Sequence, residues 1–171
     1  AAGLSYDLGL LNLGALRDAT IDELIDHCRA VADVIHVFGF FLNESVGGRH
    51  LPLEFWQRFV EIPNVLAIKV AAFNRYQTFD VVRAVAEAGR AGDIALYTGN
   101  DDNILLDLVT EYAIPTSTGV QKVRFSGGLL GHWAVWTKTA VGMMKEARQY
   151  RDYSKPLPQE FLTMAMEVTD A

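Results

Sequence analysis

Apolar runs at a nearly constant spacing constrain the fold of this 171-residue chain more than any other feature. Each run is followed by a segment with helical periodicity, and the centres of the runs lie about 28–30 residues apart, the length of one strand–helix unit. The predicted strands are Leu8–Leu13, Val34–Leu42, Val65–Phe73, Ile94–Thr98 and Val123–Ser126. Strands that are nearly all apolar and alternate with helices predict an α/β fold, with a parallel sheet covered by helices.

Helix signals fill the intervals between these runs. Thr20 and Glu23 form a capping box, in which a hydroxyl and a carboxylate satisfy free N–H groups at a helix start. Apolar residues at spacings of three and four follow it, as on the buried face of a helix. Further helices are predicted over Leu53–Val60, Phe79–Ala86, Ile104–Leu108, Gly127–Arg148 and Pro158–Val168.

Five strand–helix units fit two architectures. A five-stranded, doubly wound sheet suits a chain of this length. A (β/α)8 barrel typically needs about 250 residues, so this chain would supply about five of its eight units. Length favours the doubly wound sheet, whereas the residues inside the strands favour the partial barrel.

Composition narrows the class of protein. The net charge is −6 and the pI is about 5.1, so we expect neither a nucleic acid nor an anionic membrane as partner, because both need a basic face. The single cysteine, Cys28, excludes an internal disulfide. The longest apolar stretch, Val37–Leu42, is far shorter than a membrane span, and the first residues lack the features of a signal peptide. We therefore expect a cytoplasmic protein.

Lys69 lies in the middle of an otherwise apolar strand. Strand alternation directs Leu66, Ile68 and Val70 towards the helices, and it directs Ala67, Lys69 and Ala71 to the opposite face. A long cation between two small residues suggests a side chain that is given room in a crowded interior. Burial lowers the pKa of a lysine, and a partly neutral lysine is a nucleophile towards carbonyls. The alternative is a lysine that reaches water or a carboxylate from the strand end.

The segment Asn64–Lys69 resembles the "NIxGIK" signature of the dihydrodipicolinate synthase and N-acetylneuraminate lyase family. The resemblance runs from about Tyr6 to Arg148. Leu53-Glu54 and the helix through Arg58 are similar to the family's "PE…RL" helix. Tyr97–Asp101 resembles its "LSGDD" strand end, and Phe125-Ser126 resembles the "IS" of its eighth strand.

This resemblance implies a (β/α)8 TIM barrel and a class I aldolase or lyase that needs no cofactor. It also implies a Schiff base between Lys69 and pyruvate or another 2-oxo acid, and we expect a homo-oligomer. Aligned in this way, the first run is the fourth barrel strand, so strands four to eight are present. Strands one to three, with the family's "GTTGE" loop, are not. We accordingly predict the C-terminal portion of a barrel over residues 1–150 and a helical extension over residues 151–171.

The sequence departs from the family at the acid–base residue. The family has a tyrosine about 28 residues before its lysine, and counting back from Lys69 reaches Phe41, which carries no exchangeable proton. Glu44, Tyr97 and Asp101 are the candidate substitutes. The acid–base step then uses one of these groups, or the chain lacks it.

Glycine-rich segments suggest sites for a substrate or anion. Gly47-Gly48 follows the second run and indicates either close backbone contact with a ligand or a plain turn. Gly99 precedes Asp101 at another strand end. Ser126, Gly127 and Gly128 are predicted to open a helix after the last strand, where free N–H groups bind anions in barrels, or to form a structural turn. His132 is predicted to be a packed histidine, and no metal site is expected.

The leading functional hypothesis is a lyase in which Lys69 attacks a 2-oxo acid. A second interpretation keeps the barrel and makes Lys69 an electrostatic clamp for a phosphorylated ligand. A third is a non-catalytic binding or assembly domain, because the family's tyrosine is missing. The sequence leaves the substrate and the direction of the reaction open.

Overall fold

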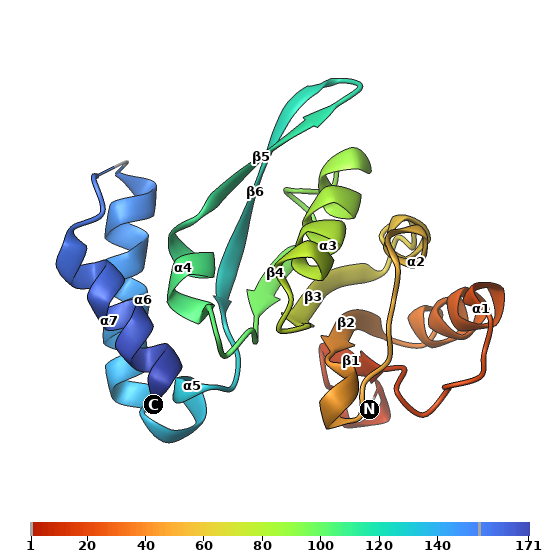
Figure 1. Ribbon diagram of the computed structural model, residues 1–171. Helices are drawn as coiled ribbons and strands as arrows, with labels where there is room; N and C mark the ends of the chain where they lie inside the picture. Colours follow the sequence, from red (N-terminus) through yellow and green to blue (C-terminus); the bar gives the residue numbers. More distant parts are fainter. Residues whose placement is uncertain (1, 154) are drawn as a thin grey trace.

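Strands and helices alternate along the chain in the order that the apolar runs predict (Figure 1). The computed structural model describes residues 2–153 and 155–171. The strands are β1 (Leu8–Asn12), β2 (His36–Leu42), β3 (Val65–Ala71), β4 (Ala95–Thr98), β5 (Glu111–Thr116) and β6 (Gly119–Gly128). The helices are η1 (Ala2–Leu4), α1 (Ile21–Ala32), η2 (Glu44–Val46), α2 (Leu53–Phe59), α3 (Arg75–Glu87), α4 (Ile104–Val109), α5 (His132–Val135), α6 (Thr137–Asp152) and α7 (Gln159–Asp170).

The order of strands in the sheet decides between the two predicted architectures. It is β1-β2-β3-β4-β6-β5, and the first five of these strands run parallel. Each parallel strand lies beside its predecessor, so the sheet has no point at which the strand order reverses. The doubly wound alternative is therefore wrong, and the parallel strands form an arc of a barrel.

One face of this arc is packed and the other is open. α1 packs against β2 and α2, and α2 packs against α3, on the outer face that holds the hydrophobic core. Thr20 and Glu23 form the predicted capping box of α1. On the inner face of β1, Leu8 and Leu10 are exposed. The predicted cover of helices is thus present on the outer face only, and the inner face is accessible.

The alternation predicted for β3 is confirmed except at one residue. Ile68 and Val70 are fully buried in the outer core, as predicted, but Leu66 is exposed. The pairing of β2 with β3 explains the exception, because its register shifts after Val37 and leaves Leu66 without a partner. The irregularity turns Leu66 away from the core.

The segment after α4 differs most from the prediction. β5, which was not predicted, pairs antiparallel with the first part of β6 to form a hairpin that projects from the body (Figure 1). β6 continues to Gly128, so the single long helix predicted over 127–148 is wrong. The short helix α5 and the longer α6 take its place.

The C-terminal helices pack beside the sheet. α6 and α7 both contact α4. α6 runs across residue 150, where a helical extension was predicted to begin, and the division into two segments stays a prediction. Within the described residues, no helix combines the length and the apolar character that crossing a membrane requires.

Candidate active site

Lys69 is buried on the inner face of the sheet. It lies in the middle of β3, where strand register pairs it with Phe40 of β2 and Tyr97 of β4. Its side chain is 4% exposed, although the inner face around β1 is open. Ala67 and Ala71, also on β3, give it the space that the sequence pattern predicted. The three neighbouring strands therefore enclose one lysine.

Burial shifts the protonation equilibrium of Lys69 towards the neutral form. Burial lowers the pKa of Lys69, and the negative charge of Asp101 opposes that shift. Among the described residues no carboxylate forms an ion pair with Nζ. Nζ instead lies 4.4 Å from the centroid of the Phe40 ring, a cation–π contact that returns part of the lost hydration energy. A lysine with a lowered pKa is more often neutral and hence more nucleophilic at neutral pH.

The Lys69→Met variant is expected to be more stable than the parent protein below about pH 10.4, the ordinary pKa of lysine. Because the pKa is lowered in the folded state, the unfolded chain binds more protons in that range, so Lys69 destabilises the fold. The gain should be largest below the folded-state pKa and should vanish as the pH rises through the unfolded value. Urea unfolding at several pH values measures it. Equal stability of both proteins at neutral pH would contradict the burial cost.

The residue beside Lys69 on β2 is Phe40. It precedes Phe41, to which the family's spacing of about 28 residues leads. Phe41 points to the opposite face, where it is 1% exposed and packs against Trp56 with ring centroids 5.2 Å apart. The count of residues ignores the register shift between Val37 and Phe38. The residue beside Lys69 is therefore Phe40, which carries no exchangeable proton either, and the acid–base or pocket role considered at Phe41 stays a prediction.

Tyr97 shares the inner face with Lys69. Its ring packs against that of Phe38 on β2, with centroids 5.5 Å apart. Gly127 of β6 lies on its other side, where a Cβ would approach the tyrosine ring to 3.1 Å. Tyr97 is therefore the tyrosine that strand register pairs with Lys69, and its hydroxyl carries an exchangeable proton.

Gly99 makes room for the lysine. It follows β4, and its N–H donates to the Val70 carbonyl at 2.7 Å. A Cβ at this position would lie 2.8 Å from Cε of Lys69 and 3.1 Å from Cβ of Ala71. Any larger residue would displace the lysine side chain, so the position of Lys69 depends on the glycine at position 99.

The two acidic candidates differ in their relation to Lys69. Asp101 is close enough for its charge to influence Lys69, and partial burial raises the pKa of Asp101 while Lys69 lowers it. Glu44 is exposed in η2, the short helix after β2. Of these two carboxylates, only Asp101 is coupled to the lysine.

A buried polar network behind the site was not predicted. Its centre is Asp107 of α4, which is 0% exposed. Its carboxylate accepts hydrogen bonds from Nη1 of Arg75 (2.6 Å), Oγ1 of Thr98 (2.6 Å), the hydroxyl of Tyr112 (2.9 Å), Nδ2 of Asn100 (3.1 Å) and Nδ2 of Asn103 (3.2 Å). The sequence held a signal: Asp107 shares the apolar helix face of Ile104 and Leu108.

This network fixes the loop that carries Gly99 and Asp101. Oδ1 of Asn100 accepts the Phe73 N–H at 3.0 Å, and Asn100 is fully buried. Phe73 has a φ of 51°, a left-handed conformation that costs free energy in a residue with a side chain. The Asn100 contact helps to hold this strained turn after β3 beside the loop after β4.

The glycines at 47 and 48 contact backbone. A Cβ on Gly48 would lie 1.8 Å from the Leu42 carbonyl oxygen, and Gly47 adopts a φ of 95°. A Cβ on Gly14, in the loop after β1, would lie 2.1 Å from the Gly47 carbonyl oxygen. The left-handed backbone explains Gly47, and the close approach to Leu42 explains Gly48, so neither glycine requires a ligand.

The segment Ser126–Gly128 lies within β6 and does not open a helix, so that prediction is wrong. Gly127 and Gly128 pair with Tyr97 and Thr98 of β4. A Cβ on Gly128 would approach the Trp133 ring to 2.9 Å, so this glycine accommodates an aromatic ring. Anion binding by these residues stays a prediction, now without the helix terminus on which it depended.

Solved structures with a similar fold include three synthases of the dihydrodipicolinate type. The enzyme from Bacteroides thetaiotaomicron superposes with a TM-score of 0.70 at 15% identity, and covers 98% of this chain and 49% of its own. The chloride-inhibited enzyme from Acinetobacter baumannii, solved with pyruvate, gives 0.67 at 17%, with 98% and 50% covered. The 4-hydroxy-tetrahydrodipicolinate synthase from Methylacidiphilum fumariolicum SolV gives 0.57 at 18%, with 94% and 51% covered.

These similarities are similarities of fold. The chain spans about half the length of the solved structures that it matches. No protein-family model matches the sequence, and no curated protein matches it either. The partial TIM barrel and the structural resemblance to dihydrodipicolinate synthases, both predicted from the motif around Lys69, are confirmed at the level of the fold.

Proposed function

We propose that this chain carries the imine-forming half of a class I aldolase site, in which Lys69 forms a Schiff base with pyruvate or another 2-oxo acid. The observation that carries the proposal is a lysine that is 4% exposed, has a lowered pKa and faces the inner side of a barrel arc. The fold shared with synthases, one of them solved with pyruvate, supports the choice of substrate class.

The proposed step is a condensation. Neutral Nζ of Lys69 attacks the carbonyl carbon of the 2-oxo acid, and loss of one water leaves a C=N bond. The protonated imine withdraws electrons from the adjacent carbon, which favours making or breaking a C–C bond there. Tyr97, by strand register, and Asp101, by its charge coupling, are the candidates to move protons in this step.

Borohydride trapping tests this function. The protein is incubated with pyruvate and a panel of other 2-oxo acids, the imine is reduced to a stable secondary amine, and modified peptides are located by mass spectrometry. We expect one dominant adduct, on Lys69. Lys122, which is 67% exposed in its side chain, serves as an internal control for non-specific modification.

The Lys69→Arg variant completes the experiment, because it keeps a cation in β3 and cannot form an imine. We expect its adduct signal to fall to the level of the surface lysines. If no 2-oxo acid of the panel modifies Lys69 above that level, the imine hypothesis is wrong. The non-catalytic binding domain would then be favoured, in agreement with the aromatic ring of Phe40 beside Lys69.

A further inference from the structure

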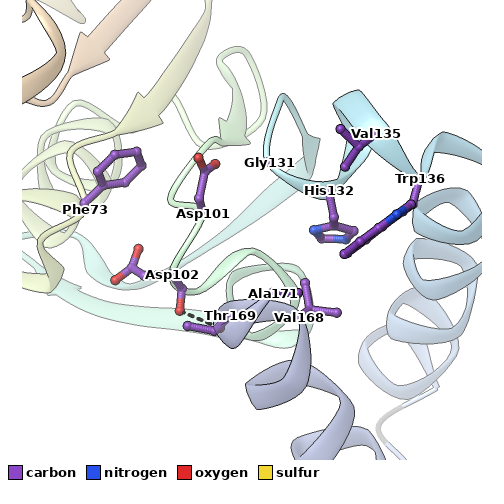
Figure 2. Close-up of a pocket in the computed structure, with 10 residues that line it drawn as sticks. All are labelled: Phe73, Asp101, Asp102, Gly131, His132, Val135, Trp136, Val168, Thr169 and Ala171. Atoms are coloured by element: carbon purple, nitrogen blue, oxygen red, sulfur yellow. Dashed lines mark hydrogen bonds between the residues drawn. The ribbon is translucent and has the colours of Figure 1, made fainter.

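A cavity of about 790 Å³ lies beyond Asp101, between the loop after β4, helix α5 and the end of α7. Its volume is in the range of sites that hold small organic molecules. Figure 2 shows Phe73, Asp101 and Asp102 along one side and His132, Val135 and Trp136 along the other. We call it the Asp101 cavity.

Asp101 connects this cavity to the lysine. Asp101 lines the cavity and lies two residues after Gly99, where a Cβ would be 2.8 Å from Cε of Lys69. The charge of Asp101 also opposes the lowering of the pKa of Lys69. Its carboxylate lies against Gly131, where a Cβ would be 2.9 Å from Oδ1. The absence of a side chain at Gly131 lets the carboxylate reach across to α5. A molecule in the cavity would therefore lie next to the carboxylate that is coupled to Lys69.

The walls of the cavity combine apolar surface with negative charge. Phe73, Val135 and Trp136 supply apolar surface that is partly exposed. Asp101 and Asp102 supply two carboxylates, whereas no lysine or arginine is found among the described residues that line it. Carboxylates without a cation in the wall repel an anion and attract a cation or a hydroxyl donor.

His132 is the second polar feature of the wall. Its side chain is 6% exposed, and its Nε2 has no hydrogen-bond partner among the described residues. Burial lowers the pKa of His132, which keeps the imidazole neutral at neutral pH. A buried polar atom without a partner costs free energy. His132 lines the cavity, so a polar group on a bound molecule would offer this nitrogen the partner that it lacks.

Helix α7 holds the loop that carries Asp101 and Asp102. Oγ1 of Thr169, near the end of α7, donates to the Asp102 carbonyl oxygen at 3.0 Å (Figure 2). α7 also contributes Val168 to the apolar wall. The position of Asp102 in the wall is therefore held by packing and by a hydrogen bond.

We propose that the Asp101 cavity binds a neutral or cationic molecule with an apolar body and one polar end, which contacts Asp102 and His132. Resting on the proposed function, we assign this molecule as the second reactant for a 2-oxo acid held on Lys69. The cavity selects against anionic partners such as carboxylated or phosphorylated aldehydes. The apolar body packs on Trp136 and Val135.

Three probes of equal size and different charge test the proposal without any carbonyl chemistry: benzyl alcohol, benzylamine and benzoate. Binding is followed by NMR through the indole N–H of Trp136 and the ring nitrogens of His132. We expect saturable shifts with benzyl alcohol and benzylamine, and binding of benzoate at least about tenfold weaker, which corresponds to about 1.4 kcal/mol. Benzoate binding as tightly as the other two would overturn the proposal.

Two variants separate charge from shape. Asp102→Asn should weaken benzylamine and strengthen benzoate, each by several-fold, whereas Asp26→Asn on the exposed part of α1 should change neither. His132→Phe keeps an aromatic ring beside Trp133 and removes the nitrogens. It should weaken benzyl alcohol several-fold without lowering the midpoint of urea unfolding, because the lost nitrogen had no partner. Unchanged probe binding in both cavity variants would contradict the proposal.

The Lys69→Arg variant distinguishes failure of this inference from failure of the proposed function. It cannot form an imine but should bind benzyl alcohol as the parent protein does. Trapping of pyruvate on Lys69 together with no shift at Trp136 or His132 would refute the cavity and leave the imine. The reverse result would leave a cavity of the proposed specificity and refute the imine.

Discussion

The Asp107→Asn variant is expected to lose about 3 kcal/mol of unfolding free energy, the lower end of the cost of breaking a buried ion pair, because Asp107 is fully buried while the Arg75 side chain is 36% exposed. The Asp107 carboxylate accepts hydrogen bonds from five side chains and forms an ion pair with Arg75 at 2.6 Å. An asparagine offers one acceptor oxygen, and its NH2 group would face donors such as the Tyr112 hydroxyl. The guanidinium of Arg75 would lose its charge partner. Equilibrium unfolding in urea measures the loss.

An exposed ion pair provides the matched control. Arg58 and Asp22 approach to 2.7 Å, but the Asp22 side chain is 80% exposed. Asp22→Asn should therefore change stability by no more than about 1 kcal/mol. Equal effects of the two substitutions would mean that the Asp107 network contributes no more than a surface ion pair, although the Asp107 side chain is fully buried.

Replacing Phe40 with tyrosine is expected to raise the rate of proton exchange at the methyl group of pyruvate by about 10²-fold or more, the usual contribution of a positioned acid–base group. The Phe40 ring lies beside Nζ of Lys69, so the new hydroxyl would be introduced next to the proposed imine. Deuterium incorporation into pyruvate, followed by NMR, measures the exchange.

The neighbouring position supplies the control. Phe41→Tyr would bury a hydroxyl in the packed face against Trp56, with an expected cost of about 1–3 kcal/mol of stability and no gain in exchange. If Phe41→Tyr accelerated exchange and Phe40→Tyr did not, the assignment of faces in β2 would be wrong. The pair therefore tests the strand register at single-residue resolution.

The sequence predicted those features that depend on local pattern. The apolar run around Lys69 and the alternation with Ala67 and Ala71 predicted a lysine buried on one face of a strand, and the structure contains it. Counting along the chain reached Phe41 because it cannot detect a register shift, which moves every later residue to the other face. The face on which a residue lies depends here on the pairing between two strands, and the sequence of one strand does not determine that pairing.

Features that depend on distant contacts were missed. β5 alternates in burial, but Pro115 argues against a strand unless it lies at an edge, which only the tertiary structure shows. The prediction of a helix from Gly127 was wrong because Gly127 and Gly128 belong to β6, where they make room for the rings of Tyr97 and Trp133. The role of Asp107 depends on its contact with Arg75, 32 positions away, and only the folded structure shows that contact.

The hairpin of β5 and β6 has a consequence for the order in which the protein folds. Thr116 pairs with Gly119, so the hairpin closes between residues that are near in sequence, and hairpins form in about 1–10 μs. The parallel pairing of Leu96 with Phe125 closes a much longer loop, which is slower. We expect β6 to be ordered by its hairpin first and then to present its final glycines as a template on which β4, with Tyr97, assembles.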